Sequence, residues 1–306
     1  MDPAISVVVP TYNGGAHIVS TLSSLAKQTY SRFEVVVVVD GSQDGTAQTI
    51  AKADLPLSMV VHEQENKGRA GARNAGLSLS KADYVVFLDD DVQASDTLIE
   101  CYAKLIREGH VVVVGSIYPL YKIENEYSRY SSYLNLKWNA DLPSGGGFLD
   151  RPYLSAANFM IKKSLMVEMG GFDSALNDAE DFDLAIRLKE AGTSIYFDPA
   201  PKVGHLIHAN FHVHMKRLLQ YKAFYRVLLA RNSAAAKYVD LNHVRNGFFR
   251  KWVYTLLSGR TLVSLIDSGV FRIIPAPLRF KLYDVVLTAY VMHNSLSAEH
   301  TKEKLN

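Results

Sequence analysis

The segment YVVFLDDDV, residues 84–92, joins an apolar run of five residues to three consecutive carboxylates, Asp89, Asp90 and Asp91. A short apolar run followed by polar residues predicts a buried β-strand. Three like charges at its end repel one another, and a cation bound nearby would offset that repulsion. Carboxylate oxygens suit Mg²⁺ or Mn²⁺, which share their coordination with substrate phosphates. The alternative interpretation is an acidic turn in water, and the rest of the chain bears on that choice.

Strand-like and helix-like segments alternate around this run. Apolar strands separated by amphipathic helices predict βαβ units, and therefore an α/β fold with a mixed, mostly parallel, Rossmann-like sheet. We predict strands at 5–9, 33–39, 58–63 and 84–88, and helices at 16–28, 46–53 and 71–80. In open sheets of this kind, ligands bind beyond the carboxyl ends of the strands.

Polar motifs follow three of these strands, at the edge where a ligand would bind. They are PTYN at 10–13, DGSQDGT at 40–46 and DDD at 89–91. A fourth motif, NKGRAGARNAG at 66–76, combines glycines that let a backbone approach a ligand with three cationic side chains. The sequence therefore predicts a phosphate-binding and metal-binding edge.

The second half of the chain changes character. Further strands are predicted at 110–121 and 154–161, followed by helices at 164–169 and 180–191. From about residue 210 onward the pattern is mainly helical, with breaks at Gly259, Pro275 and Pro277.

Composition limits the class of protein. With 306 residues, 48% of them hydrophobic, the chain is long enough for one large domain or one domain with an appendage. The single cysteine, Cys101, excludes an intramolecular disulfide and a Cys-based zinc cluster, which fits a reducing compartment. We expect no secretory signal and no spanning helix, because no apolar run reaches the ~20 residues that a helix needs to cross a bilayer.

The net charge of +2 is unevenly distributed. Residues 1–200 contain 17 Lys and Arg against 26 Asp and Glu, whereas residues 201–285 contain 14 against 3. Within the basic part, residues 215–231 place apolar side chains at near-helical spacing among Lys and Arg. Such a helix either lies on an anionic membrane surface or packs against the protein with its charges in water. We expect residues 211–285 to attract an anionic membrane surface, and we find no nucleic-acid motif.

Six motifs occur in one order: SVVVPTYN, VVVVDGSQDGT, ENKGRAGARNAGL, YVVFLDDDV, AANFMI and NDAEDFDLAIRLKEAG. In this order they resemble the family 2 glycosyltransferases of the GT-A fold, over roughly residues 4–208. The resemblance implies a catalytic domain at 1–210, with a nucleotide-binding half at 1–115 and an acceptor half at 116–210. A basic amphipathic helical extension would follow at 211–306.

The resemblance also implies an activity. It is the metal-dependent transfer of a sugar from a nucleotide-diphospho sugar, expected to be a UDP-sugar, to a hydroxyl of a glycan or lipid-linked acceptor. Two alternatives remain open: a catalytically inactive protein that binds nucleotide or glycan, and a sugar-phosphate nucleotidyltransferase. The expected location is cytoplasmic, with a peripheral position on the inner face of the membrane.

By resemblance, the donor is bound by the first three motifs. Thr11, Tyr12 and Asn13 would form the walls of the nucleoside pocket, and Pro10 would shape the turn before them. Asp40 would bind the base or ribose, unless it serves as a residue of the turn that begins the next helix. Many relatives carry two acids at this point, whereas Val39 occupies the first position here. Gly68 would let the backbone approach the donor, and Arg73 would contact it, unless Arg73 is a packing or surface residue.

The DDD motif and a distant histidine are the expected metal ligands. Asp91 is the expected direct ligand of Mn²⁺ or Mg²⁺, while Asp89 would orient the ribose or a metal-bound water, and Asp90 would also face the donor. His205 lies in the sequence VGH, which we interpret as a turn. Some family members place a histidine there that completes the metal or diphosphate site, and a packing role is the alternative.

The Glu180-Asp181 pair opens a predicted amphipathic helix. The resemblance assigns Asp181 as the general base that accepts the proton of the acceptor hydroxyl, while the diphosphate leaves from the opposite face, which implies inversion. Acidic residues also suit a helix N-terminus electrostatically, which is the alternative. Glu180, Asn158 and Trp138 are weaker candidates for acceptor contacts.

Overall fold

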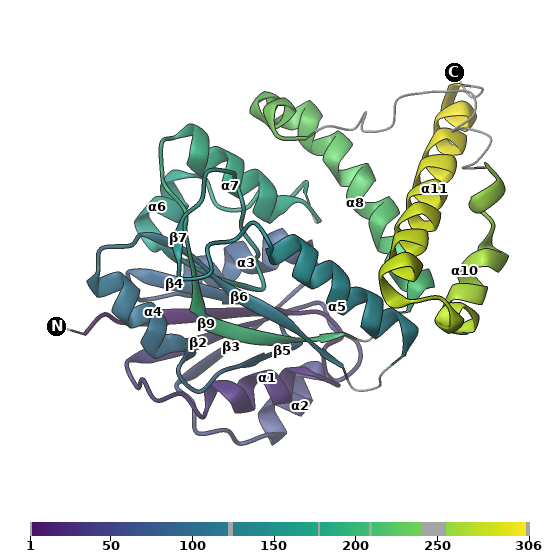
Figure 1. Ribbon diagram of the computed structural model, residues 1–306. Coiled ribbons are helices and arrows are strands. Elements are labelled where there is room, and N and C mark those ends of the chain that lie inside the picture. Colours follow the sequence, from purple (N-terminus) through teal and green to yellow (C-terminus); the bar gives the residue numbers. More distant parts are fainter. Residues whose placement is uncertain (1, 122–124, 177, 208–209, 240–254, 304–306) are drawn as a thin grey trace. The chain divides into compact units, whose positions relative to one another are not determined.

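The computed structural model describes residues 2–303 apart from 122–124, 177, 208–209 and 240–254 (Figure 1). The chain divides into two compact units. Unit 1 comprises residues 1–120, 141–206 and 227–238, and unit 2 comprises residues 121–140, 207–226 and 239–306. Compared with the boundary expected after residue 210, unit 2 also contains the segment 121–140, and unit 1 also contains 227–238.

Unit 1 is built on a mixed sheet with the strand order β3-β2-β1-β4-β8-β6-β9-β5, in which β7 also pairs with β9. The strands are β1 (Ile5–Thr11), β2 (Phe33–Asp40), β3 (Met59–Gln64), β4 (Tyr84–Leu88), β5 (Val92–Ala94), β6 (Val112–Tyr121), β7 (Gly147–Phe148), β8 (Asn158–Lys162) and β9 (Tyr196–Ile207). The first four strands pair in parallel, whereas β8, β5 and β7 pair antiparallel with their neighbours. The mixed α/β fold predicted from the sequence is confirmed.

Helices cover both faces of this sheet, so the central strands are mostly apolar (Figure 1). On one face lie α1 (Ile18–Leu25), α2 (Thr46–Lys52) and α4 (Leu98–Arg107), and on the other lie α3 (Gly68–Leu79), α6 (Lys163–Glu168) and α7 (Glu180–Glu190). Successive valines of β2 alternate between the two cores: Val37 packs into the first and Val36 into the second. Two covered faces explain why five consecutive valines are buried.

Strand β9 was not expected from the sequence. The VGH segment, interpreted as a turn, belongs to this strand, and His205 pairs with Val92 of β5 in an antiparallel register. Pro199, Pro201 and Gly204 interrupt the apolar pattern and hide the strand. The expected turn was therefore wrong, and the correction places His205 on a rigid element.

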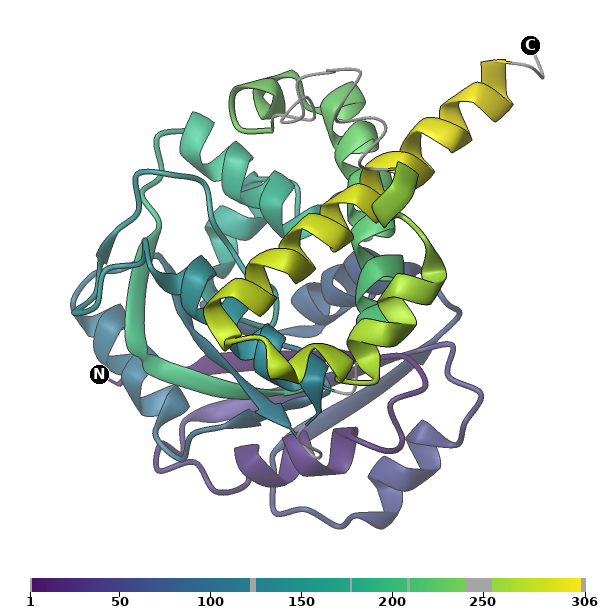
Figure 2. The same ribbon diagram turned by 45° about the vertical axis from the view of Figure 1, so that its right-hand side comes forward.

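Unit 2 contains α5 (Glu126–Asn139), most of α8 (Phe211–Arg231), α10 (Arg260–Asp267), the 3₁₀ turn η2 (Val270–Ile273) and α11 (Ala276–Glu303) (Figure 2). The end of α8 and the turn η1 (Ser233–Lys237) belong to unit 1. Aromatic and aliphatic side chains from all four helices form a separate core in unit 2, including Tyr130, Phe211, Val263 and Tyr283. Among the described residues, no helix combines the length and hydropathy needed to cross a membrane.

The side chain of Glu126 lies at the centre of unit 2 and is fully buried. Its Oε1 lies 2.7 Å from Nε of Arg279, and its Oε2 accepts from Nε of Arg272 at 2.9 Å. The hydroxyl of Tyr283 donates to Oε1 at 3.1 Å. Two cations and a hydroxyl therefore compensate one buried carboxylate and link α5 to the η2 and α11 segments.

Candidate active site

Side-chain hydrogen bonds join the loops that follow β1 and β2. Asn13, at φ 52°, donates its backbone N–H to Ser42 Oγ at 2.9 Å, and its Oδ1 accepts from the N–H of Gln43 at 2.8 Å. In the same loops, Asp44 accepts from the N–H of Gly15 at 3.0 Å. The PTYN and DGSQDGT motifs therefore form one connected edge at the carboxyl ends of the strands.

Asp40 ends β2 and is only 3% exposed. Its Oδ1 accepts from Nε2 of Gln64 at 2.7 Å and from the N–H of Lys67 at 2.8 Å. This carboxylate thus ties the end of β2 to the segment before α3. Local hydrogen bonding at the start of α2 belongs instead to Asp44, which accepts from the N–H and hydroxyl of Thr46.

The side chain of Asp90 is bonded to the end of β1. Thr11 donates its hydroxyl to Asp90 Oδ2, and a Cβ on Gly14 would lie 2.2 Å from that same oxygen. Burial, together with the charges of Asp91 and Asp89, raises the pKa of Asp90 to about 6, although the Thr11 hydrogen bond acts in the opposite direction. Asp90 therefore links β1 to β4, a different environment from that of its two neighbours.

Arg73 lies on α3 and is 3% exposed. Its two terminal nitrogens donate to Glu180 Oε1 at 2.5 Å and to Asp89 Oδ1 at 2.7 Å. The guanidinium also lies 5.6 Å from the ring centroid of Phe172. Burial alone would raise the pKa of Asp89, but the charges of Arg73 and His205 outweigh it, so the pKa lies below its ordinary value. Arg73 thus joins the start of α7 to the end of β4.

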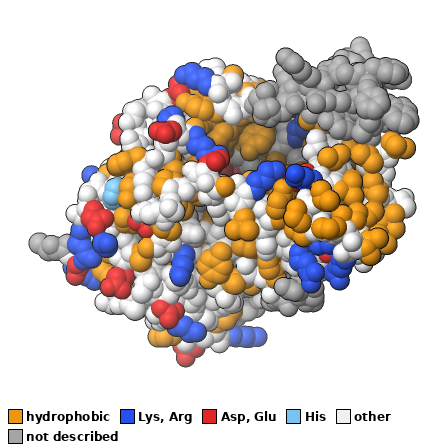
Figure 3. Space-filling model, viewed as in Figure 1, with side chains coloured by type: hydrophobic (Ala, Val, Ile, Leu, Met, Phe, Trp, Pro, Cys, Tyr) orange, Lys and Arg blue, Asp and Glu red, His pale blue; other side chains and the backbone are white. Residues whose placement is uncertain are grey.

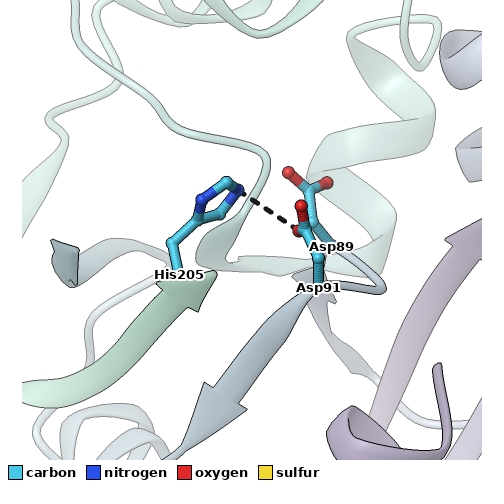
Figure 4. Close-up of side chains that lie close together, drawn as sticks. All are labelled: Asp89, Asp91 and His205. Carbon is cyan, nitrogen blue, oxygen red and sulfur yellow. Dashed lines mark ion pairs between the residues drawn. The ribbon is translucent and has the colours of Figure 1, made fainter. Parts of the chain in front are cut away.

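Asp89, Asp91 and His205 form a group that could hold a metal ion, since one ligand atom from each lies within 4.8 Å of the others. Figure 4 shows the imidazole directed toward the two carboxylates, and His205 Nε2 lies 3.2 Å from Asp91 Oδ1. Strand pairing produces this geometry: the N–H of Leu206 donates to the backbone oxygen of Asp91 at 2.9 Å.

The donor set of this group fits a divalent cation. Two carboxylate oxygens and one imidazole nitrogen suit Mn²⁺, and the carboxylates also suit Mg²⁺. The side chains of Asp89 and Asp91 are each 29% exposed and that of His205 is 19% exposed, so the group is open to solvent on one side. An ion there would keep coordination positions for a substrate.

Glu180 and Asp181 occupy the first turn of α7, as expected from the sequence. Glu180 is 4% exposed, and among the described residues its Oε2 has no hydrogen-bond partner. Asp181 is half-buried and accepts from the N–H of Ala156 at 3.3 Å. Burial raises the pKa of Asp181, and the charge of Arg73 opposes the shift without cancelling it.

The remaining candidates lie in varied environments. Pro10 is buried in β1, Tyr12 is 56% exposed, and Gly68 begins α3 at φ 74°.

Asn158 is fully buried: its Oδ1 accepts from the hydroxyl of Tyr102, and its Nδ2 donates to backbone oxygens of Ser116 and Pro201. Asn158 therefore has no exposed surface to offer an acceptor. Trp138 lies on α5 of unit 2 and is 60% exposed.

Sequence reasoning missed the contact between Arg73 and Glu180. These residues are 107 positions apart, so no local pattern joins them. A signal was present around Arg73, because a charged residue among small neighbours indicates a buried charge that needs a partner.

Residues 6–172 match the family model described as Glycosyl transferase family 2. The chain belongs to glycosyl transferase family 2, and it is a glycosyltransferase of the GT-A fold. It is 29% identical to glycosyltransferase AglE of Haloferax volcanii over 227 residues, which cover 69% of this chain and 72% of AglE. It is 30% identical to a pre-mycofactocin glycosyltransferase of Mycobacterium tuberculosis over 234 residues, which cover 72% of this chain and 46% of that relative.

Solved structures share the fold at low sequence identity. The mannosyltransferase PcManGT of Pyrobaculum calidifontis, in complex with GDP-Man and Mn²⁺, is 20% identical with a TM-score of 0.63, covering 96% of this chain and 87% of its own. TarS 1-349 of S. aureus, in complex with UDP, is 19% identical with a TM-score of 0.54, covering 97% of this chain and 92% of its own.

Proposed function

We propose that this glycosyltransferase is metal-dependent and inverting, and that it moves a sugar from a nucleotide-diphospho sugar to a hydroxyl of a glycan or lipid-linked acceptor. One observation carries the proposal: Arg73 donates to Asp89 of the metal group and to Glu180 at the start of α7, and its charge also acts on the half-buried Asp181. The metal group and Asp181 thus supply a cation site and a base in one place, as group transfer from a diphosphate requires.

The donor would lie along the edge formed by the loops after β1, β2 and β4. Exposed Tyr12 offers a ring for the base, and the loop joined by Asn13 and Ser42 holds it in place. Asp40 Oδ1 is engaged within the protein, so a contact with the nucleoside would use its other oxygen. A UDP-sugar is the proposed donor, in keeping with the UDP in the TarS complex. GDP-sugars deserve equal testing because PcManGT holds GDP-Man.

The diphosphate would be bound at the Asp89, Asp91 and His205 group. A divalent ion held there neutralises the charge that develops on the leaving diphosphate. Arg73 fixes the carboxylate of Asp89, and the imidazole of His205 lies against Asp91. These contacts hold the ligand atoms in position before the substrate arrives, which lowers the cost of reorganisation.

In the transfer step, Asp181 would accept the proton of the acceptor hydroxyl. The acceptor oxygen forms a bond to the anomeric carbon while the bond from that carbon to the diphosphate oxygen breaks, and the electron pair leaves with the nucleoside diphosphate. Attack on the face opposite the leaving group inverts the anomeric configuration. The N–H of Ala156 holds the carboxylate, and the raised pKa of Asp181 brings its basicity closer to neutral pH.

Glu180, Asn158 and Trp138 take different places in this proposal. Glu180 is a positioning residue, since it is buried against Arg73. Asn158 is fully engaged in the core, and we leave it out of the acceptor site. Trp138 stays a candidate for stacking on a sugar ring because it is exposed. A lipid-linked acceptor would bring the enzyme to the cytoplasmic face of a membrane.

The test is release of nucleoside diphosphate from a panel of UDP-, GDP- and dTDP-sugars, with Mn²⁺ or with EDTA. We expect metal-dependent release from one donor. Release of pyrophosphate from a sugar phosphate and a nucleoside triphosphate would point to nucleotidyl transfer instead. If no nucleoside diphosphate is released and thermal shift detects no nucleotide binding, with candidate acceptors present, the result would support a catalytically inactive binding protein.

Replacing the proposed base separates binding from chemistry. Asp181→Asn keeps the size of the side chain and removes its basicity, so we expect unchanged donor affinity and a transfer rate lowered about 10²- to 10⁴-fold. Donor affinity is measured by calorimetry and transfer by single-turnover kinetics. Asp178→Asn, which alters a surface ion pair with Arg69 at the approach to the same helix, is the matched control. A wild-type rate in Asp181→Asn would remove Asp181 from the mechanism.

A further inference from the structure

The turn between α10 and α11 exposes an unusual amount of apolar surface. Val270, Ile273 and Leu278 are 52%, 90% and 61% exposed, and we call these three side chains the apolar tip. Figure 2 shows the turn that carries them, and in Figure 3 apolar side chains gather over α10 and α11 with Lys and Arg at the border. Single exposed apolar residues are common, whereas three within nine residues, one of them almost fully exposed, indicate a binding surface.

The apolar tip lies within residues 211–285, which were expected to attract an anionic membrane surface, but outside the amphipathic segment 215–231. The basic amphipathic helix expected to face a membrane is α8, but Phe211 and Met215 are buried in the unit 2 core, and Leu218 and Leu219 pack against it. Those side chains are therefore not available to a bilayer. Part of the expected basic range, residues 240–254, lies outside the described residues.

The shape of the tip is held by a buried arginine. Arg279, 6% exposed, donates to the backbone oxygens of Arg272 and Ile274 at 3.2 and 3.0 Å, and it pairs with Glu126 in the core. The turn is thus fastened from inside while Ile273 points outward. An apolar group that is held in an exposed position loses little conformational freedom when it enters a binding partner.

The charge around the tip is strongly positive. In unit 2, the described residues 210–226 and 255–285 contain eight Lys and Arg against two acids, Asp267 and Asp284, and two of these cations, Arg272 and Arg279, pair with Glu126 of α5. Both acids are engaged within the unit: Asp267 accepts from the N–H of Phe211, and Asp284 accepts from Tyr130 and Lys137. Of the basic residues closest in sequence to the tip, Arg279 is buried, whereas Arg272 and Lys281 are exposed.

We propose that the apolar tip inserts into the interface of an anionic lipid bilayer, with the surrounding Lys and Arg over the headgroups. An apolar tip within a basic surface matches the two layers of such an interface, hydrocarbon beneath negative charge. A second copy of the chain fits less well, because a symmetric contact would bring Arg272 and Lys281 of both copies together. The inference goes beyond the proposed function and does not depend on it.

Vesicle flotation of the full-length chain tests the apolar part. With phosphatidylcholine vesicles containing phosphatidylglycerol, we expect the wild type to float. We expect Ile273→Asp to bind these vesicles at least about tenfold more weakly. Val167→Asp is the matched control, because Val167 is a 60% exposed apolar residue of α6 in unit 1. Both variants should keep the wild-type urea midpoint, since both sites are exposed.

The charge is tested in the same assay. We expect Lys281→Ala to weaken binding about fivefold, as expected for one cation near an anionic surface, and binding to fall as salt rises. Lys104→Ala is the control, since its side chain is 71% exposed in unit 1. Vesicles of pure phosphatidylcholine should bind much less protein.

Three outcomes would overturn the proposal. The first is no flotation of the wild type with anionic vesicles. The second is equal binding by Ile273→Asp and the wild type. The third is self-association in sedimentation that Ile273→Asp abolishes, without vesicle binding, which would assign the tip to a contact between copies. Nucleoside diphosphate release by the same samples reports on the proposed function separately.

Discussion

Among the described residues, each unit contains a cluster of arginines and acids around a buried Glu side chain, and the two clusters have opposite charge balance. In unit 1, Arg73 lies between Glu180 and Asp89, so one cation serves two carboxylates. In unit 2, Glu126 lies between Arg272 and Arg279, so two cations serve one carboxylate. Both oxygens of Glu126 have partners, whereas Oε2 of Glu180 has no hydrogen-bond partner among the described residues.

This difference separates a supporting cluster from a functional one. The unit 2 cluster is complete within the protein and needs nothing further to hold α5, η2 and α11 together. The unit 1 cluster, with Asp91 beside it, retains excess negative charge that a bound cation would compensate. Incomplete compensation of charge at an open strand end therefore marks the candidate active site.

The largest expected effect comes from removing a carboxylate of the metal group. Asp91→Ala should lower metal-dependent turnover about 10³-fold, because a bound ion supplies several kcal/mol of transition-state stabilisation. Initial rates over a Mn²⁺ titration provide the measurement. Asp96→Ala, an exposed acid five residues further along, is the control and should retain activity. An equal loss of turnover in both variants would contradict the assignment of Asp91 as a metal ligand.

Removing one cation from each cluster tests the comparison through stability. Arg73→Met leaves the buried Glu180 and the half-buried Asp89 without their cation and should lower the free energy of unfolding by about 3–5 kcal/mol. Arg272→Met should cost only about 1 kcal/mol, because Glu126 retains Arg279 and Tyr283, and the side chain of Arg272 is 49% exposed. Urea unfolding of the two variants measures the difference, and equal losses would mean that the clusters are equivalent.

The smallest effect is a shift in pH dependence. Burial raises the pKa of Asp181, and the base must be ionised, so turnover should fall about tenfold per pH unit below a pKa higher than that of a free aspartate. For stability the sign is opposite: this carboxyl contributes most below its unfolded pKa, and the contribution is lost as pH rises through the folded pKa. A pH-rate profile with unfolding measured in parallel tests both directions. An acid limb at the pKa of an exposed aspartate would contradict the burial argument.

The parts of the fold that local pattern determines could be predicted from the sequence. Residues 84–88 form β4 as predicted, because an uninterrupted apolar run ends at three carboxylates. The start of α7 at Glu180 was also predicted, since acids precede an amphipathic repeat. β9 could not be predicted, because its prolines and glycine break the pattern and only pairing with distant strands makes it a strand.

The residues of the candidate site were found more readily than their contacts. Asp89, Asp91 and His205 were grouped by resemblance, and the structure brings them together through the register of β5 and β9. Arg73 was expected to face a donor, yet both terminal nitrogens donate to carboxylates of the protein. The contact with Glu180 depends on how segments 107 residues apart pack, which a local motif does not encode.

The pairing of β5 with β9 limits where the chain can tolerate insertions and deletions. Side chains alternate between the two faces of a strand, so deleting Val92 would put Asp91 in its place opposite His205 and turn the carboxylate to the other face. The turn at Gly192, where an added Cβ would meet no heavy atom within 4 Å, leaves room for an extra residue. Insertions and deletions should therefore be tolerated in that turn and selected against at residues 89–94 and 203–206.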